Sequence, residues 1–141
     1  METTRRSFSI STTDRFEIRN VTAGVEDALA ELSASDGLVY VSTPHTSAAL
    51  STNEFEEKLV DDMLDTLADL VPPNDGYYHD LDHVRAGEEP NAHAHILSAM
   101  IDRSVFAVLQ DGRMQLGTWE EILFYEFCGP RDRTIEVTLL E

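Results

Sequence analysis

The C-terminal third of the chain constrains the fold most, because it carries four strand-like segments in close succession. These segments are residues 105–109, 114–116, 122–127 and 134–140. Each is a short apolar or alternating stretch, as strands of a packed sheet are. Asp111-Gly112 separates the first two and is a dipeptide typical of hairpin turns. Gly129-Pro130 separates the last two. We therefore expect a β-rich C-terminal third.

The N-terminal part alternates between strand and helix patterns. Ser7–Ser11 alternates polar and apolar residues, and the alternation resumes at 16–18 after a turn at Thr13-Asp14, which predicts a hairpin. Thr22 is expected to cap a helix that stops before Gly37. The apolar residues 38–41 then predict a short buried strand.

The middle of the chain carries two further helix patterns around a long loop. Asn53 is the expected N-cap of the longest helix, which Pro72-Pro73 ends. Its apolar stripe is Phe55, Leu59, Met63, Leu67 and Leu70. Residues 74–92 have no periodicity, and Asn91 is expected to cap a short helix after them. About seven strands and three helices without regular βαβ alternation predict one α+β domain over 1–141.

The charge of the chain excludes several classes of partner. Asp and Glu number 27 against 10 Lys and Arg, a net charge of -17. Nucleic acid and anionic membranes require a basic surface, so we expect neither as a partner. Of the ten cations, only Lys58 is a lysine, and an acidic, Lys-poor surface suits a solvent of high salt. We therefore expect a halophilic protein.

The remaining features of composition indicate a soluble, cytoplasmic protein. Cys128 is the only cysteine, so no disulfide forms within the chain, and it is expected to be a small buried apolar residue. No apolar run approaches the ~20 residues of a membrane span. Residues 1–9 lack the apolar core of a signal peptide.

All five histidines lie in loops or at element ends between Pro44 and Ile96, which favours a functional site there. They are His45, His79, His83, His93 and His95. Imidazoles bind Zn²⁺ and similar ions, and a catalytic site uses three protein ligands and an open position. His93 and His95 are two residues apart and point to different sides of a helix, so only one of them easily joins a common site.

A phosphate site in so acidic a chain needs local positive charge. Arg131 and Arg133 beside Gly129-Pro130 supply it, as does the helix start at Asn91. The alternative interpretation of both arginines is a surface ion pair of little energetic value. Ser47 near His45 lacks the glycine elbow of an α/β-hydrolase, and no glycine-rich nucleotide-binding loop is present.

A series of motifs along nearly the whole chain resembles the YjbQ family. The motifs are His45-Thr46-Ser47-Ala48-Ala49-Leu50, Asn53-Glu54, Tyr77-Tyr78-His79-Asp80, Asn91-Ala92-His93-Ala94-His95, Asp111-Gly112-Arg113, Leu116-Gly117-Thr118-Trp119, Glu126 and Gly129-Pro130-Arg131. Two positions depart from the family pattern. Pro90 replaces the acidic residue usual before Asn91, and Glu120 replaces the Gln that commonly follows Trp119.

The resemblance implies a β-sandwich of about seven strands that trimerises through its sheets, and a secondary thiamine-phosphate synthase activity. That reaction joins a pyrimidine diphosphate to a thiazole phosphate and releases pyrophosphate. The resemblance further implies a divalent metal ion, Zn or Mg, at His45, His79 and His95. It implies support or catalysis by Glu54 and Glu126. Contacts to a small phosphorylated substrate are implied for Asn91, Thr118 and Arg131.

Two other functions remain open at this level. One is a non-catalytic trimeric protein whose histidine pocket binds a metal ion or small ligand. The other is a metal-dependent phosphoesterase, which would use the same ligands with water as the nucleophile.

Overall fold

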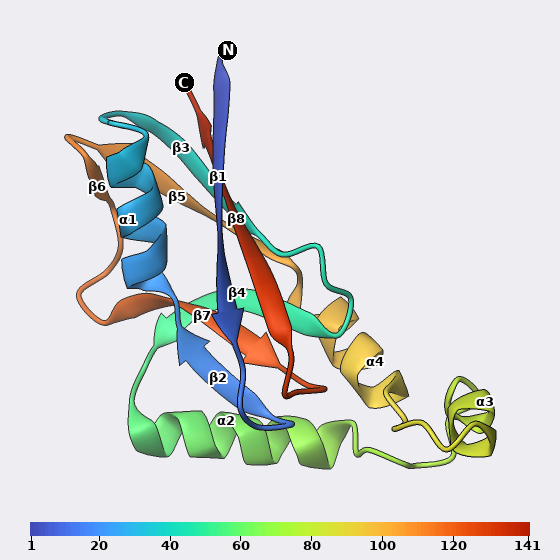
Figure 1. Cartoon of the computed structure of the whole chain (residues 1–141). Coiled ribbons are helices and arrows are strands. Elements are labelled where there is room, and N and C mark those ends of the chain that lie inside the picture. The colour runs from blue at the N-terminus through green and yellow to red at the C-terminus, as the bar shows by residue number, and fades with distance from the viewer.

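The two ends of the chain form neighbouring antiparallel strands of a five-stranded sheet. In the computed structural model, which describes residues 1–141, β1 (Thr3–Ser11) pairs along its whole length with β8 (Asp132–Leu140). The sheet continues in the order β1-β8-β3-β5-β6. Its other strands are β3 (Gly37–Ser42), β5 (Ser104–Gln110) and β6 (Arg113–Met114). The two termini consequently lie side by side at one end of the molecule (Figure 1).

A three-stranded antiparallel sheet crosses below the first. Its order is β2-β7-β4, with β2 (Glu17–Asn20), β7 (Glu120–Glu126) and β4 (Ala48–Glu54). The central strand β7 is covered on both faces. Ile122 and Phe124 pack toward the five-stranded sheet, and Leu123 and Tyr125 pack toward the opposite side. This explains why 122–125 is a continuous apolar run rather than an alternating one.

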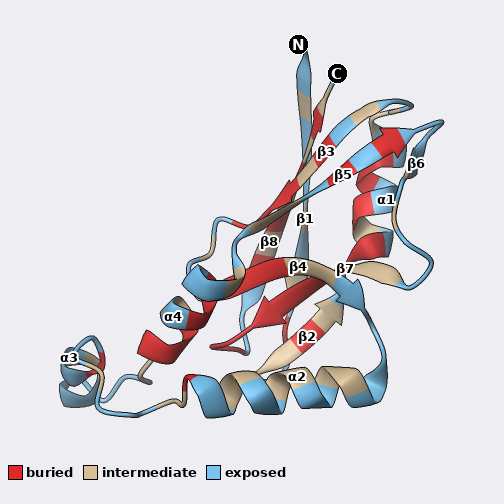
Figure 2. Cartoon of the chain, turned by 180° about the vertical axis from the view of Figure 1, so that it is seen from behind, coloured by how far each residue is buried: buried red, intermediate tan, exposed pale blue.

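Four helices cover the sheets. They are α1 (Thr22–Glu31), α2 (Glu57–Leu70), α3 (Asp80–Arg85) and α4 (Ala92–Ile101). Val25 and Leu29 of α1 complete the core between the two sheets. Leu97 of α4 and the partly buried face of α2 cover the outer side of the three-stranded sheet. The other faces of α2 are open to solvent, as Figure 2 shows, and α3 projects beyond the sheets.

The structure confirms an α+β fold with eight strands and four helices, one of each more than the sequence predicts. The Asp111-Gly112 turn is confirmed, with φ of 51° and 75° between β5 and β6. Cys128 is buried. The predicted hairpin of the first two strands is wrong, because β1 and β2 belong to different sheets. The chain leaves the first sheet at Thr12, whose amide donates to the Arg131 carbonyl.

The predicted start of the longest helix is also wrong. Asn53 belongs to β4, a strand the sequence did not reveal, and α2 begins at Glu57. The cap is Glu56, whose carboxylate accepts from the Lys58 and Leu59 amides. The expected loop of 74–92 contains the short helix α3. None of the helices is long and apolar enough to cross a membrane.

Candidate functional site

Most of the predicted site residues gather where β7 ends, β8 begins and α4 starts. Glu126 is the last residue of β7, and Arg131 directly precedes β8. Asn91 precedes α4, and His95 lies in its first turn. His45 lies in the connection from β3 to β4. Segments far apart in the sequence therefore meet at one end of the three-stranded sheet.

A buried ion pair forms the floor of this region. Glu126 is fully buried and Arg133 is 3% exposed, and the guanidinium donates from Nε and Nη2 to the two carboxylate oxygens. Thr12 Oγ1 and the Cys128 amide also donate to Glu126. Burial alone would raise the pKa of Glu126, but these hydrogen bonds and the charge of Arg133 hold it below its usual value of 4.5. Glu126 is thus an anchored carboxylate rather than a proton donor.

His45 is held as a neutral imidazole beside this pair. Its Nε2 accepts a hydrogen bond of 2.9 Å from the Thr134 amide, so the proton of the neutral ring is on Nδ1. Burial lowers the pKa of His45 from 6.5, and the positive charge of Arg133 lowers it further. His45 consequently offers an N–H donor rather than a free lone pair.

A polar pocket of about 390 Å³ opens above the ion pair. It is lined by His45, Ser47, Asn91, Arg131, Asp132 and Arg133. Arg131 Nε donates to the Cys128 carbonyl at 2.8 Å, which fixes the direction of its guanidinium. Arg133 Nη2 donates to Ser47 Oγ at 3.0 Å. Two guanidinium groups and an imidazole N–H around one cavity favour an anionic ligand.

The helix start at Asn91 is not available to that ligand. The amides of Asn91 and Ala92 both donate to Asp80 Oδ1, at 3.1 and 2.9 Å. A carboxylate thus already occupies the amide donors that a phosphate would use. Asn91 can still contribute through its side chain, whose Oδ1 accepts from His79 Nε2 at 3.0 Å.

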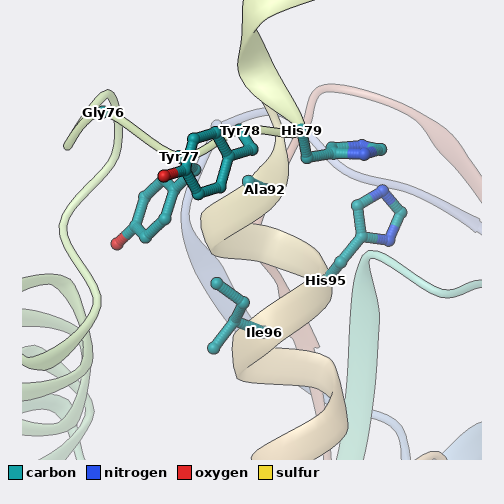
Figure 3. Close-up of a pocket in the computed structure, with 7 residues that line it drawn as sticks. All are labelled: Gly76, Tyr77, Tyr78, His79, Ala92, His95 and Ile96. Atoms are coloured by element: carbon teal, nitrogen blue, oxygen red, sulfur yellow. The ribbon is translucent and has the colours of Figure 1, made fainter.

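A second, more apolar pocket of about 540 Å³ lies beside α4. It is lined by Gly76, Tyr77, Tyr78, His79, Ala92, His95 and Ile96. In Figure 3 the imidazoles of His79 and His95 face each other on one side, and Tyr77, Tyr78 and Ile96 lie on the other. The two imidazole centres are 5.2 Å apart, and Tyr78 is 92% exposed. The bond between His79 and Asn91 links this pocket to the polar one.

The three histidines predicted to bind a metal ion do not form one ligand set within this chain. His95 Nδ1 donates to the Thr46 carbonyl, which leaves Nε2 as its lone-pair nitrogen. His79 lies against His95 and also against His83, at 5.0 Å. The Nε2 of His45 is already bonded to Thr134. No three His, Cys, Asp or Glu side chains of the chain are grouped to hold one metal ion.

Two predicted residues lie at the other end of the three-stranded sheet. Glu54 ends β4 opposite Glu120, whereas Glu126 pairs with Ala48 at the start of that strand. Six residues of strand, about 20 Å, separate the two ends. Thr118 precedes Glu120 by two residues and lies at the same end as Glu54. Neither belongs to the pockets described above.

Some residues of the site have roles that sequence patterns do not reveal. Asp80 holds the start of α4 although eleven residues separate it from Asn91. Of the five histidines, His93 is fully buried and stacks on Phe16, so it belongs to the core. Burial lowers its pKa from 6.5, although its hydrogen bond to the Phe127 carbonyl opposes this. Position near the end of an element does not by itself distinguish a site histidine from a core one.

Comparisons with known proteins agree with the motifs. Residues 6–141 match the family described as UPF0047 protein YjbQ-like. A UPF0047 protein of Archaeoglobus fulgidus is 41% identical, over 94% of this chain and 98% of its own length. A solved structure of a hypothetical protein from Aeropyrum pernix has a TM-score of 0.89 at 38% identity, covering 99% of this chain and 98% of that one. A YjbQ/UPF0047 structure from Clostridium acetobutylicum has a TM-score of 0.85 at 32% identity, covering 96% and 99%.

Proposed function

The chain belongs to the UPF0047 YjbQ-like family, and we propose that it is a transferase of the thiamine-phosphate synthase type. The proposed reaction joins a pyrimidine diphosphate to a thiazole phosphate. The carbon–oxygen bond to the diphosphate breaks, the bond from the thiazole nitrogen to that carbon forms, and pyrophosphate leaves. The observation that carries the proposal is the polar, arginine-lined pocket joined to an apolar pocket through His79 and Asn91.

The polar pocket suits the diphosphate. In a chain of net charge -17, Arg131 and Arg133 both line this cavity, with Asp132 between them. The charge of Arg133 is neutralised by Glu126, whereas Arg131 donates to a neutral carbonyl, so Arg131 is the arginine whose charge is available to a ligand. The Nδ1–H of His45 supplies a neutral donor. Donors placed where negative charge develops on the leaving pyrophosphate would favour its departure.

The apolar pocket suits a flat heteroaromatic ring. Tyr78 and Ile96 supply apolar surface, and an exposed aromatic ring is available for stacking. His95 Nε2 is a hydrogen-bond acceptor, because Nδ1 donates to Thr46. A ring amino group is the type of donor such an acceptor would orient.

The divalent metal ion stays a prediction, and the three histidines do not fit it within one subunit. We therefore assign the ion no step. The geometry predicts that His45→Ala leaves the metal content of the purified protein unchanged, since its Nε2 bonds to the Thr134 amide. Elemental analysis of the wild type and His45→Ala tests this. Metal that is bound by the wild type and lost in His45→Ala would show that His45 is a ligand after all.

We further propose a homotrimer formed through the open face of the five-stranded sheet. Phe106 and Val108 on this face are 58% and 55% exposed, and Tyr40 and Leu38 pair with them across β3 and β5. An exposed apolar patch of neighbouring side chains favours association. Glu54 and Thr118 could then serve the same reaction only from another copy. Light scattering of the wild type and Phe106→Glu tests this, and a monomeric wild type would refute it.

The activity is tested with pure protein, both phosphorylated substrates and a range of divalent metals at low and high KCl. We expect thiamine phosphate and pyrophosphate in equal amounts. Arg131→Gln should lower kcat/KM at least ~10-fold, which is about 1.4 kcal/mol. Arg113→Gln is the matched control, because that residue follows the β5–β6 turn and lines neither pocket.

Each other function predicts a different result in the same assay. Release of inorganic phosphate without thiamine phosphate would indicate a phosphoesterase. Binding of either substrate without turnover would indicate a ligand-binding protein. Equal activity of Arg131→Gln and the wild type would overturn the assignment of the polar pocket.

A further inference from the structure

Three buried polar atoms have no hydrogen-bond partner among the protein atoms. They are Arg15 Nε, Asp80 Oδ2 and His93 Nδ1. Asp80 is 5% exposed and His93 is fully buried. An unpaired buried polar atom costs about 1–3 kcal/mol, so three of them require an explanation.

The three residues converge on one short segment at the start of α4. Arg15 Nη2 donates to the Pro90 carbonyl at 3.1 Å. Asp80 Oδ1 accepts from the amides of the next two residues, Asn91 and Ala92. His93 follows directly, and the charges of Arg15 and Asp80 both act on its ring. The residues that carry the unpartnered atoms therefore come from the β1–β2 connection, α3 and α4, and each of them contacts or belongs to the segment 90–93.

The chemistry of these atoms restricts what can bind them. His93 Nε2 donates to the Phe127 carbonyl at 2.9 Å, so Nδ1 of the neutral ring is an acceptor. Asp80 Oδ2 is a second acceptor, and Arg15 Nε–H is a donor. Glu89 Oε1 lies 3.2 Å from that Nε as an ion pair but without hydrogen-bond geometry. The guanidinium disfavours a metal cation, and the carboxylate disfavours an anion.

A water molecule matches this set, because it can donate two hydrogen bonds and accept another. We propose that one internal water binds Arg15 Nε, Asp80 Oδ2 and His93 Nδ1 and fastens α3 to the start of α4. Internal waters typically make about three hydrogen bonds to otherwise unpaired groups. Asp80 directly follows His79, whose imidazole lies opposite His95 (Figure 3), so the water would fasten the segment that carries this imidazole. The proposal goes beyond the transferase function and holds whatever the reaction.

A matched pair of substitutions at position 93 separates the water from the rest of the packing. His93→Gln keeps an amide N–H that can donate to the Phe127 carbonyl and removes the Nδ1 acceptor. His93→Asn keeps an acceptor at the Nδ1 position and removes the donor to Phe127. A merely structural role of the ring would make both variants behave alike.

Crystal structures that resolve ordered solvent provide the first measurement. We expect one density peak about 2.7–3.2 Å from all three atoms in the wild type and in His93→Asn, and none in His93→Gln. No peak in the wild type, or a peak that persists in His93→Gln, would overturn the proposal. So would a peak about 2.0–2.2 Å from His93, because that is a metal–ligand distance.

Amide exchange and water contacts in solution provide a second measurement on the full chain. In the wild type, the His93 or Ala92 amide should show magnetisation transfer from a long-lived water. In His93→Gln that signal should disappear, and the Asn91 and Ala92 amides that Asp80 accepts should exchange faster. The inference would be contradicted if the wild type showed no such water signal and the amides of His93→Gln exchanged at the wild-type rate.

Discussion

At the scale of single residues, the buried pair of Glu126 and Arg133 connects stability to the site. Each charge is stabilised by the other, because water does not reach this position and cannot solvate an unpaired charge there. We predict that Glu126→Gln lowers the free energy of unfolding by about 3–5 kcal/mol, because Arg133 loses its partner. Urea denaturation followed by circular dichroism measures this.

The control for that prediction is an exposed ion pair. Glu31 lies 3.7 Å from Arg6, with side chains 68% and 50% exposed. Glu31→Gln should change the free energy of unfolding by less than about 0.5 kcal/mol. If both substitutions had the same small effect, the buried pair would not carry the energy assigned to it.

Acidification should destabilise the protein through the same region. Burial lowers the pKa of His45 and His93 from 6.5, so below pH 6.5 the unfolded chain binds more protons than the folded one. Their contribution to stability is complete above pH 6.5 and is lost as the pH falls through the folded pKa values. Glu126 extends the loss below pH 4.5, since its pKa is also lowered.

The measurement is histidine titration by NMR together with the free energy of unfolding at each pH. Resonances of His45 and His93 should titrate with midpoints below 6.5. His45→Gln should make the free energy of unfolding depend less on pH below 6.5 than it does in the wild type. A wild-type His45 midpoint at or above 6.5 would contradict the prediction.

The directions of single side chains also limit how far the site can be predicted from the sequence. Polar side chains that lie between Pro44 and Ile96 in the sequence line both pockets, and Arg131 and Arg133 join them in the polar one. The sequence does not predict that His45 faces the Thr134 amide while His79 faces His95. The direction of His45 depends on a hydrogen bond to a residue 89 positions away, and that of His79 on a ring contact with a residue 16 positions away, which spacing does not encode.

At the scale of elements, the boundary between β4 and α2 shows how capping competes with strand pairing. Asn53 is a good N-cap by residue type, yet β4 pairs with β7 as far as Glu54. Strand pairing decides where the chain can turn, and the Glu56 carboxylate then accepts hydrogen bonds from the first amides of α2. The strand escaped prediction because Ala48–Glu54 is short of β-branched residues and polar at its end.

We predict that Glu56→Ala lowers the free energy of unfolding by about 0.5–2 kcal/mol, since two helix amides lose their acceptor. Asn53→Ala is the matched comparison, because that side chain only accepts from its neighbour Glu54. Thermal denaturation of the two variants decides the matter. A larger loss of stability in Asn53→Ala than in Glu56→Ala would show that Asn53 is the cap, as expected from the sequence.

At the scale of the whole molecule, the arrangement of the core follows from β7 being apolar on both faces. One face meets the five-stranded sheet and α1, and the other meets α2 and α4. The α+β class was predictable from the order of elements. The division into two sheets was not, because it depends on β1 pairing with β8 across the whole length of the chain.

The net charge of -17 is also a property of the whole molecule, and α2 displays it most. Asp61, Asp62, Asp65 and Asp69 lie on its solvent face, and none of them forms an ion pair. Their mutual repulsion is screened only by salt. The Debye length falls from about 10 Å at 0.1 M to about 3 Å at 1 M.

We therefore predict that the unfolding temperature rises steeply with KCl between about 0.1 M and 1 M, over which screening removes most of this repulsion. A variant with Asp61→Asn, Asp65→Asn and Asp69→Asn should be more stable than the wild type at low salt and depend less on KCl. Because the substitutions leave the core and both pockets intact, a changed salt dependence reports surface repulsion alone. Undiminished wild-type stability in dilute buffer would show that the acidic surface is tolerated without salt, and the halophilic interpretation would then fail.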